Sequence, residues 1–211
     1  MNQMEALLKI SKEKVIVILR SLPATNLLHT LEALYQGGVR CVEVTMNTSG
    51  ALEMIRVAKE VYGAKMLIGA GTVLDSSTAR LAILAGADFV LSPHLSLEVI
   101  STCHLYGKLA VPGVLTPTEA VAAQQAGALL IKVFPIDTLG PGYLKSLLAP
   151  LGQLRLLPVG GVDEHNAAAY LDHGAFAVGI GSCLVTKQII ESEDFNLLKE
   201  KTKELVRSIK K

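Results

Sequence analysis

Aromatic residues are scarce in this sequence. They make up 4% of the 211 positions, and tryptophan is absent. An excess of charge of one sign is lacking as well, because 20 lysines and arginines stand against 19 aspartates and glutamates. Without aromatic side chains to stack on bases or a basic field to hold a polyanion, nucleic acid is not expected as a partner.

Long hydrophobic runs are also missing, although half of the residues are hydrophobic. The most apolar stretches, Leu109–Leu115 and Ala126–Ile131, are broken by proline or glycine or end at a lysine. Both fall well short of the roughly 20 residues that a membrane span needs. Charged residues interrupt the N-terminal segment, so no signal-peptide core is visible. We therefore expect a soluble, cytoplasmic chain with no membrane partner.

Cysteine is infrequent. Cys41, Cys103 and Cys183 are an odd number, and their spacing matches neither a zinc site nor a CxxC motif. We predict that they serve as small packing residues without chemistry.

What the sequence does contain is a repeat. Short β-rich runs alternate along the chain with segments of helical spacing. A glycine precedes seven of the eight runs, and each of these glycines is predicted to end a helix with a positive φ. The predicted strands are Val15–Leu19, Cys41–Met46, Met66–Ala70, Asp88–Ser92, Leu109–Gly113, Leu129–Phe134, Leu154–Val159 and Phe176–Ile180. The glycines are Gly38, Gly63, Gly86, Gly107, Gly127, Gly152 and Gly174.

Alternating strands and helices leave two main architectures, an open doubly wound sheet or a closed barrel. Eight units favour closure, so we predict an α/β fold in which residues 1–211 form a single (β/α)8 TIM barrel domain. An extra N-terminal helix is expected before Val15, at the bottom of the barrel. A final amphipathic helix is expected over Phe195–Lys211, with Leu197, Leu198, Leu205 and Ile209 on its buried side.

Three ionisable residues lie within or directly after predicted strands, where a barrel of this kind places its active site. Lys132 stands in an apolar strand, and burial would lower its pKa and leave a nucleophilic amine of the kind that forms Schiff bases. Glu43 could then move protons, and Arg20 could hold a carboxylate. The alternatives are a buried ion pair between Lys132 and Glu43 and an arginine that only snorkels at the rim.

The loops after the seventh and eighth predicted strands are rich in glycine. Gly160 and Gly161 follow one strand, and Gly181 and Ser182 follow the other. Glycines there let backbone N–H groups approach an anion, and a helix opening after Ser182 would add its partial positive charge. We predict a phosphate site at this corner.

Metal ligands are few. Of the five histidines, only His94 directly follows a predicted strand. One histidine cannot form the usual catalytic site with three ligands. We therefore predict neither a metal nor a cofactor.

Several motifs together carry a family resemblance. They are Glu43 on the second strand, Gly69-Ala70-Gly71-Thr72, Ser92-Pro93-His94, Thr116-Pro117-Thr118-Glu119, Lys132-Val133-Phe134-Pro135 and the two glycine corners. Through all eight units the chain resembles the bacterial KDPG/KHG aldolases.

That resemblance implies a homotrimeric class I aldolase of carbohydrate metabolism, of the Entner-Doudoroff type. Such an enzyme cleaves 2-keto-3-deoxy-6-phosphogluconate to pyruvate and glyceraldehyde 3-phosphate, and the family also includes cleavage of 4-hydroxy-2-oxoglutarate. By the resemblance Lys132 forms the imine and Glu43 moves the protons. It further implies that Thr72, Pro93 and Phe134 line the pyruvyl pocket, and that Gly160, Gly161, Gly181 and Ser182 bind the phosphate.

Two positions depart from the better-known members of that family. Asn47 replaces the arginine that meets the substrate carboxylate, so Arg20 is expected to take over that charge. Val159 replaces a threonine. Both features are similar to the 2-keto-3-deoxy-6-phosphogalactonate aldolases, which makes the galactonate substrate one alternative. A phosphosugar epimerase or synthase of the same fold without an imine, and a barrel that binds a metabolite without catalysis, are the others.

Overall fold

Parallel strands form the centre of the molecule. The computed structural model describes residues 1–209. Each of the eight predicted strands is found, although most are shorter than expected, and the fifth is divided in two at Pro112. Proline has no N–H to donate, so a ladder is readily interrupted there. The strands are β1 Val15–Leu19, β2 Cys41–Thr45, β3 Leu67–Gly71, β4 Phe89–Leu91, β5 Leu109–Val111, β6 Gly113–Val114, β7 Ile131–Val133, β8 Leu156–Pro158 and β9 Val178–Ile180.

The strand order is simple. Six strands pair side by side in the order β5-β4-β3-β2-β1-β9, and three more pair in the order β6-β7-β8, with the neighbours running parallel in both groups. Every residue of these strands is buried. Such burial on both faces is typical of parallel sheets covered by helices. The fold is therefore α/β, built on a parallel sheet that forms a half-barrel.

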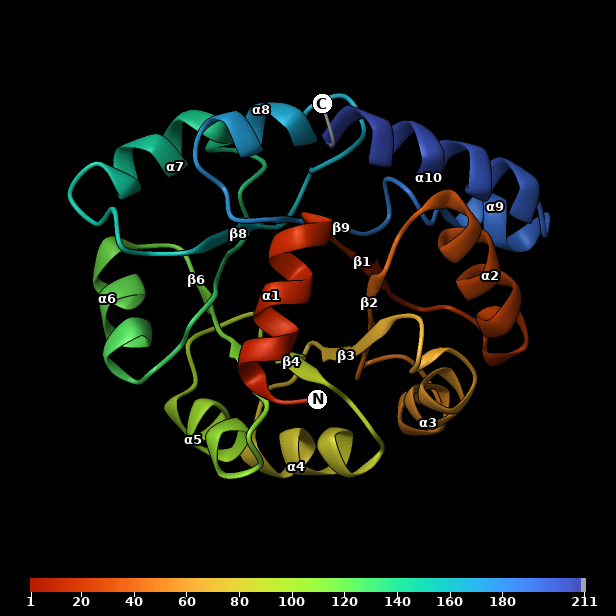
Figure 1. Ribbon diagram of the computed structural model, residues 1–211, viewed down its shortest axis with the longest axis horizontal. Coiled ribbons are helices and arrows are strands. Elements are labelled where there is room, and N and C mark those ends of the chain that lie inside the picture. The colour runs from red at the N-terminus through yellow and green to blue at the C-terminus, as the bar shows by residue number, and fades with distance from the viewer. Residues whose placement is uncertain (210–211) are drawn as a thin grey trace.

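Helices surround the strands, as Figure 1 shows. They are α1 Gln3–Glu13, α2 Leu27–Gly37, α3 Ala51–Tyr62, α4 Ser76–Leu84, α5 Leu97–Leu105, α6 Pro117–Gln125, α7 Gly140–Leu148, α8 Ala167–Asp172, α9 Lys187–Glu191 and α10 Phe195–Ile209, and a 3-10 turn η1 spans Ala24–Asn26. Within residues 1–209, no helix combines the length and the apolar character needed to cross a bilayer.

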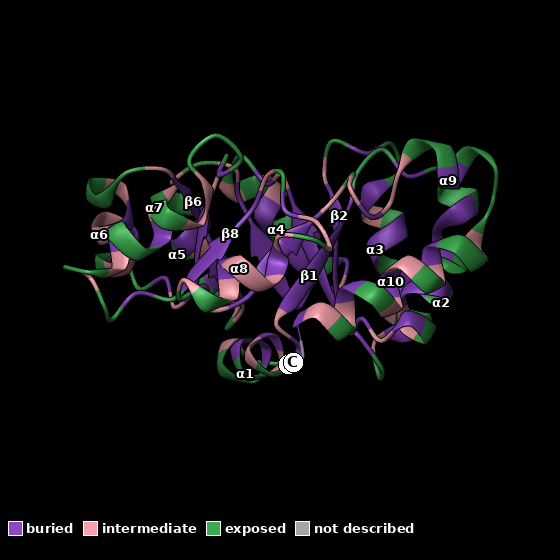
Figure 2. Cartoon of the chain, turned by 90° about the horizontal axis from the view of Figure 1, so that it is seen from above, coloured by how far each residue is buried: buried purple, intermediate pink, exposed green. Residues whose placement is uncertain are grey.

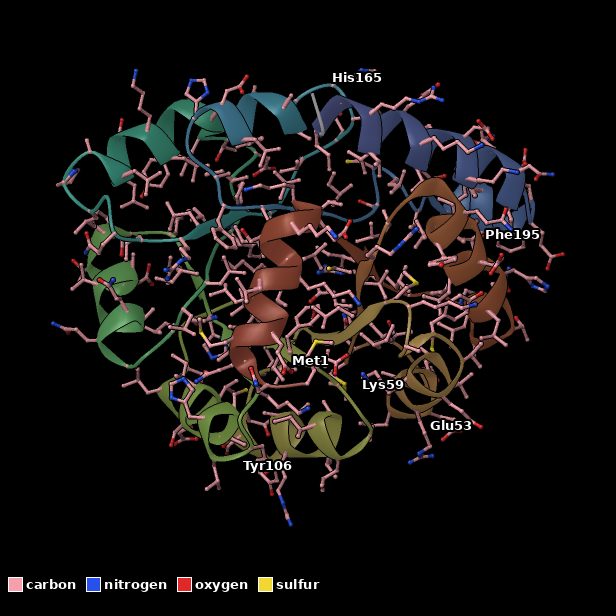
Figure 3. The ribbon with its side chains drawn as sticks, viewed as in Figure 1. Met1, Glu53, Lys59, Tyr106, His165 and Phe195 are labelled. Atoms are coloured by element: carbon pink, nitrogen blue, oxygen red, sulfur yellow. The ribbon has the colours of Figure 1, made fainter. Side chains whose placement is uncertain are left out.

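The helix α1 lies across one end of the strands (Figures 1 and 2). Asn2 and Glu5 start it with a reciprocal capping box. In Figure 3, Met1 lies near the centre of the view, whereas Glu53, Tyr106, His165 and Phe195 lie around the outer ring.

Two apolar cores follow from the alternation of side chains along each strand. The outer core lies between strands and helices and includes Val42, Val44 and Val133. The inner core lies among the strands and includes Ile16, Ile18, Cys41, Phe89 and Leu157, together with Ala6, Leu7 and Ile10 of α1. The helix α1 thus buries its apolar face against the residues that the strands turn inward.

Two of the seven helix-ending glycines were predicted wrongly. Gly38, Gly86, Gly107, Gly127 and Gly174 have positive φ angles, but Gly63 has a φ of −59° and Gly152 is not among the positive-φ glycines. At Gly63 the chain continues in a right-handed turn beyond α3, so no reversal of φ is needed.

The buried face of the last helix also differs from the prediction at one position. Leu197 is 46% exposed, while Leu198, Thr202, Leu205 and Ile209 are buried. These four follow helical spacing, and Leu197 lies one residue outside their stripe. Lys210 and Lys211, included in the predicted helix, lie outside the described residues.

Candidate active site

Two charged side chains stand within β2 and β7, and a third directly follows β1. Neighbours two residues away belong to the inner core: Ile18 precedes Arg20, Cys41 precedes Glu43, and Leu130 precedes Lys132. The intervening residues, such as Val42, Val44 and Val133, belong to the outer core. Because side chains repeat with a period of two, Glu43 and Lys132 point to the interior side of the strands, whereas Arg20 is exposed just past the end of β1.

Lys132 is buried, with 2% of its surface exposed. Burial lowers the pKa of its amine, the charge of Glu43 opposes that shift, and the charge of Arg20 adds to it. Within the described part of the chain, its Nζ contacts no hydrogen-bonding partner, and it lies 4.5 Å from the centre of the Phe134 ring. The amine therefore carries its proton less readily than an exposed lysine, which favours nucleophilic attack.

The side chain of Glu43 is buried to about the same extent as that of Lys132. It is 1% exposed, and its buried Oε2 has no hydrogen-bonding partner among the residues that the structure describes. Burial raises the pKa of the Glu43 carboxyl to about 7, although the charges of Lys132 and Arg20 act in the opposite direction. No ion pair joins it to Lys132 among residues 1–209, so the ion-pair alternative is not what the structure contains. A carboxyl with a pKa near neutrality can both accept and donate a proton.

Gly71, at the end of β3, explains how the carboxylate fits. A Cβ atom built there would lie 2.5 Å from the Cδ and Oε2 atoms of Glu43 and 2.6 Å from its Oε1. The carboxylate thus packs directly on the glycine backbone, and any side chain at this position would occupy its space.

We expect Gly71→Ala to lower kcat by about 10- to 100-fold, because a displaced carboxylate loses its alignment with the reacting atoms. Gly142→Ala is the matched control, since a Cβ there meets no atom within 4 Å and its φ is not positive. Steady-state kinetics and thermal unfolding of both variants measure the effect. Equal kcat values for the two variants would contradict the role of Gly71.

A cavity of about 510 Å³ opens beside these residues. Its lining contains seven of the residues predicted from the sequence: Arg20, Phe134, Val159, Gly160, Gly161, Gly181 and Ser182. Arg20 lines the cavity, and its exposed side chain has no hydrogen bond or ion pair to any residue in the described range, so its donors are available to an anion.

The glycine corner forms one wall of this cavity. Gly160 and Gly161 have φ angles of +105° and +67°, which only glycine adopts without strain. The strands β8 and β9 meet just before it, where Val159 and Gly179 form an isolated bridge.

The helix expected directly after Ser182 begins later. The Gly181 carbonyl accepts hydrogen bonds from the N–H groups of Leu184 and Val185, forming a turn. Thr186 then caps α9, which starts at Lys187. The helix predicted after Ser182 therefore exists but starts only at Lys187, so loop N–H groups are what this corner offers to an anion.

Five predicted residues are not among the described residues that line the cavity: Lys132, Glu43, Asn47, Thr72 and Pro93. Lys132 lies beside the cavity, because its Nζ is 4.5 Å from the ring centre of Phe134, which lines it. Asn47 is exposed in the turn after β2. Thr72 follows Gly71 with a φ of +54°. Pro93 lies against Gly113, where an added Cβ would approach the Pro93 carbonyl carbon to 2.5 Å, and Gly113 is the register partner of Lys132. The structure thus places Thr72 and Pro93 on the strand ends around Glu43 and Lys132, and Asn47 in the turn that follows Glu43's strand.

The sequence analysis missed much of the apolar wall. Ile18, Leu22 and Val185 line the cavity, and so does Lys187. Ile18 could have been found, because it stands two residues before Arg20 on the same face of a strand. The others lie in loops or at a helix start, where no periodicity marks them. No cluster of three potential metal ligands occurs among residues 1–209.

Comparison with known proteins gives a consistent result. A family model described as KDPG and KHG aldolase matches residues 6–200. The chain is 38% identical over 165 residues to 2-dehydro-3-deoxy-phosphogluconate aldolase of Treponema pallidum (strain Nichols), covering 78% of each protein. It is 35% identical over 175 residues to 2-dehydro-3-deoxy-6-phosphogalactonate aldolase of Escherichia coli (strain K12), covering 82% of this chain and 85% of that protein.

A solved structure extends the likeness to three dimensions. KDPG aldolase from Legionella pneumophila, with pyruvate captured at low pH as a covalent carbinolamine intermediate, matches with a TM-score of 0.89 and 27% identity. The match covers 96% of this chain and 98% of that one.

Proposed function

Because the chain belongs to the KDPG and KHG aldolase family, we propose that it is a class I aldolase that cleaves a phosphorylated 2-keto-3-deoxy sugar acid. The observation that carries this proposal is the buried amine of Lys132, which has a lowered pKa and interacts electrostatically with the buried carboxyl of Glu43. We assign 2-keto-3-deoxy-6-phosphogluconate as substrate, with pyruvate and glyceraldehyde 3-phosphate as products. Cleavage of 4-hydroxy-2-oxoglutarate would use the same residues.

The proposed reaction begins with attack of the Lys132 amine on the C2 carbonyl. Water leaves the resulting carbinolamine, with its proton supplied by Glu43, and a protonated imine remains. Glu43 then takes the proton of the C4 hydroxyl through a water molecule. The C3–C4 bond breaks, its electron pair moves into the imine to give an enamine, and the aldehyde leaves. Protonation of C3 and hydrolysis of the imine release pyruvate and restore the free lysine.

The remaining cavity residues would bind the two ends of the substrate. Arg20 offers a planar fork for the carboxylate. Gly160, Gly161, Gly181 and Ser182 would hold the phosphate through N–H and hydroxyl groups. Thr72, Pro93 and Phe134 would surround the pyruvyl unit. No metal and no cofactor take part in this scheme, since the protonated imine accepts the electron pair.

The galactonate substrate is a second candidate, and a specific residue favours it. Val159 presents methyl groups to the cavity where a threonine would present a hydroxyl. A missing hydrogen bond near C4 can change discrimination between the two configurations of that carbon. Side-by-side measurement of kcat/KM on the gluconate and galactonate substrates decides between them.

Trapping with borohydride tests the proposed chemistry. In the presence of pyruvate, borohydride should reduce the imine and attach a stable adduct to Lys132, which peptide mass spectrometry locates. An unmodified Lys132 would instead favour an epimerase or synthase of the same fold that forms no imine. Tight binding of phosphorylated ligand without product would point to a protein that binds but does not catalyse.

We also propose that residues 1–211 form a single domain with a closed (β/α)8 barrel and α1 across its bottom. Closure is supported by the Val159–Gly179 bridge and by a hydrogen bond of 2.9 Å from the Phe176 N–H to the Leu156 carbonyl. The chain also runs directly from β5 to β6 through Pro112, which joins the two groups of strands. We place the enzyme in the cytoplasm, because a phosphorylated substrate does not cross a bilayer unaided.

A homotrimer is the assembly we propose. Its support is a group of leucines that are more than half exposed on and beside the adjacent helices α4 and α5: Leu74, Leu81, Leu84, Leu97 and Leu105. Exposed apolar patches of this kind mark contact surfaces between proteins. Sedimentation equilibrium gives the number of chains directly.

A further inference from the structure

The backbone on both sides of Arg20 is held by two buried threonines, Thr45 at the end of β2 and Thr48 in the turn after it. The Ser21 N–H donates a hydrogen bond of 3.0 Å to the Thr48 Oγ1 atom. The Thr48 and Thr45 hydroxyls are 3.0 Å apart, and the Thr45 hydroxyl donates to the Leu19 carbonyl at 3.4 Å. Both threonines are buried: Thr45 has no exposed surface, and Thr48 is 7% exposed.

The direction of these hydrogen bonds follows from the number of protons. A hydroxyl has one proton, and that of Thr45 is used on the Leu19 carbonyl. The proton between the two hydroxyls must therefore come from Thr48, whose oxygen accepts from Ser21. A single chain of donors runs from the peptide after Arg20, through both threonines, to the peptide before it.

This arrangement matters because no other side-chain hydrogen bond or ion pair at Arg20 is found among residues 1–209. In the described range its guanidinium has no hydrogen-bonding or ionic partner, so its position over the cavity depends on the backbone that carries it. That backbone is strained, because Ser21 has a φ of +51° in the left-handed region. A non-glycine residue in this region raises the free energy of the folded state unless contacts with its surroundings offset that cost. The hydrogen bond from the Ser21 N–H to Thr48 supplies such compensation.

We infer that Thr45 and Thr48 are positioning residues that aim Arg20 at the substrate carboxylate. Neither threonine lines the cavity, so they act through Arg20 and not on the substrate. The inference rests on the proposed function, in which Arg20 binds the carboxylate. It adds an explanation of how Thr45 and Thr48, at and after the end of β2, fix the position of the Arg20 charge.

The test replaces Thr48 by valine, which keeps the shape and removes the hydroxyl, and by serine, which keeps the hydroxyl. We expect Thr48→Val to raise the pyruvate concentration for half-maximal borohydride trapping, and KM for the sugar acid, by roughly 5- to 20-fold. The kcat should change by less than about twofold, because the groups that react are untouched. Thr48→Ser should resemble the unsubstituted enzyme. Thr45→Val removes the donor to Leu19 and should raise the same two concentrations as Thr48→Val. It serves as the test variant if Thr48→Val fails to fold.

Thr30→Val is the matched control. Thr30 is a fully buried threonine of α2 whose hydroxyl has no hydrogen-bonding partner within residues 1–209. Its removal should leave the half-maximal pyruvate concentration and the KM unchanged. Unchanged trapping and KM in Thr48→Val would overturn the inference, provided that the unsubstituted enzyme forms the adduct. Absence of the adduct in the unsubstituted enzyme would instead refute the proposed function.

A double-mutant cycle separates positioning from general stabilisation. If the threonines act through Arg20, Thr48→Val should change the half-maximal pyruvate concentration by less than about twofold once Arg20 is alanine. If the two effects multiply, the threonines act independently of Arg20 and the inference is wrong.

Discussion

Lys132→Met is expected to abolish turnover, with a loss in kcat on the order of 10⁵-fold, the size seen when a covalent nucleophile is removed from an enzyme. Methionine is unbranched and of similar length, so it fills the space of the lysine chain in the inner core. It cannot form an imine. Because the buried amine no longer has to be desolvated, the unfolding temperature should stay the same or rise. Steady-state kinetics and calorimetry give both quantities.

Lys132→Arg is the companion variant. Arginine keeps a positive charge but has no amine that can attack a carbonyl near neutral pH. It should therefore be as inactive as Lys132→Met. Full activity of the arginine variant would show that the charge, and not the amine, is what the reaction needs, and would support the epimerase or synthase alternative.

Glu43→Gln has the second largest expected effect, a fall in kcat/KM of about 10²- to 10⁴-fold, the usual contribution of general acid–base catalysis. The pH dependence gives a sharper test. Because burial raises the pKa of Glu43 to about 7, kcat for the cleavage step should fall about tenfold per pH unit below that value, as the carboxylate that accepts the C4 hydroxyl proton is lost. The residual activity of Glu43→Gln should lack this acid limb. A variant that keeps the same limb would assign it to another group.

The stability of the folded protein should depend on the ionisation of Glu43 in the opposite direction to activity, because the carboxylate that accepts the proton is costly to bury. A carboxyl whose pKa is higher in the folded than in the unfolded chain binds its proton more tightly when folded. Its contribution to stability is therefore fully present below the unfolded pKa, near 4.5, and declines as the pH rises toward 7. Thermal unfolding should show Glu43→Gln to be more stable than the unsubstituted protein at pH 8, with the difference shrinking at acid pH. A constant difference would show that burial of the charge is not its cause.

The strand pattern could be predicted because it is a local property of the chain. Alternating residues around Cys41, Glu43 and Val44 reveal which side of the strand each side chain faces, since a strand repeats every two residues. The prediction was less successful at strand ends, at Gly63 and at the start of α9. There, hydrogen bonds such as those from Leu184 and Val185 to Gly181 decide the backbone, and composition does not indicate them.

The sequence by itself determined the α/β order, the inward direction of Glu43 and Lys132, and the glycine corner, because periodicity and residue type act between near neighbours. Only the tertiary structure decided that β2 and β7 bring their charged residues within electrostatic reach, and that Gly71 leaves space for a carboxylate. It alone decided that Thr45 and Thr48 bracket Arg20. Each of these contacts joins residues from different strands, so it depends on how the strands are registered and assembled, and no local pattern in the chain encodes it.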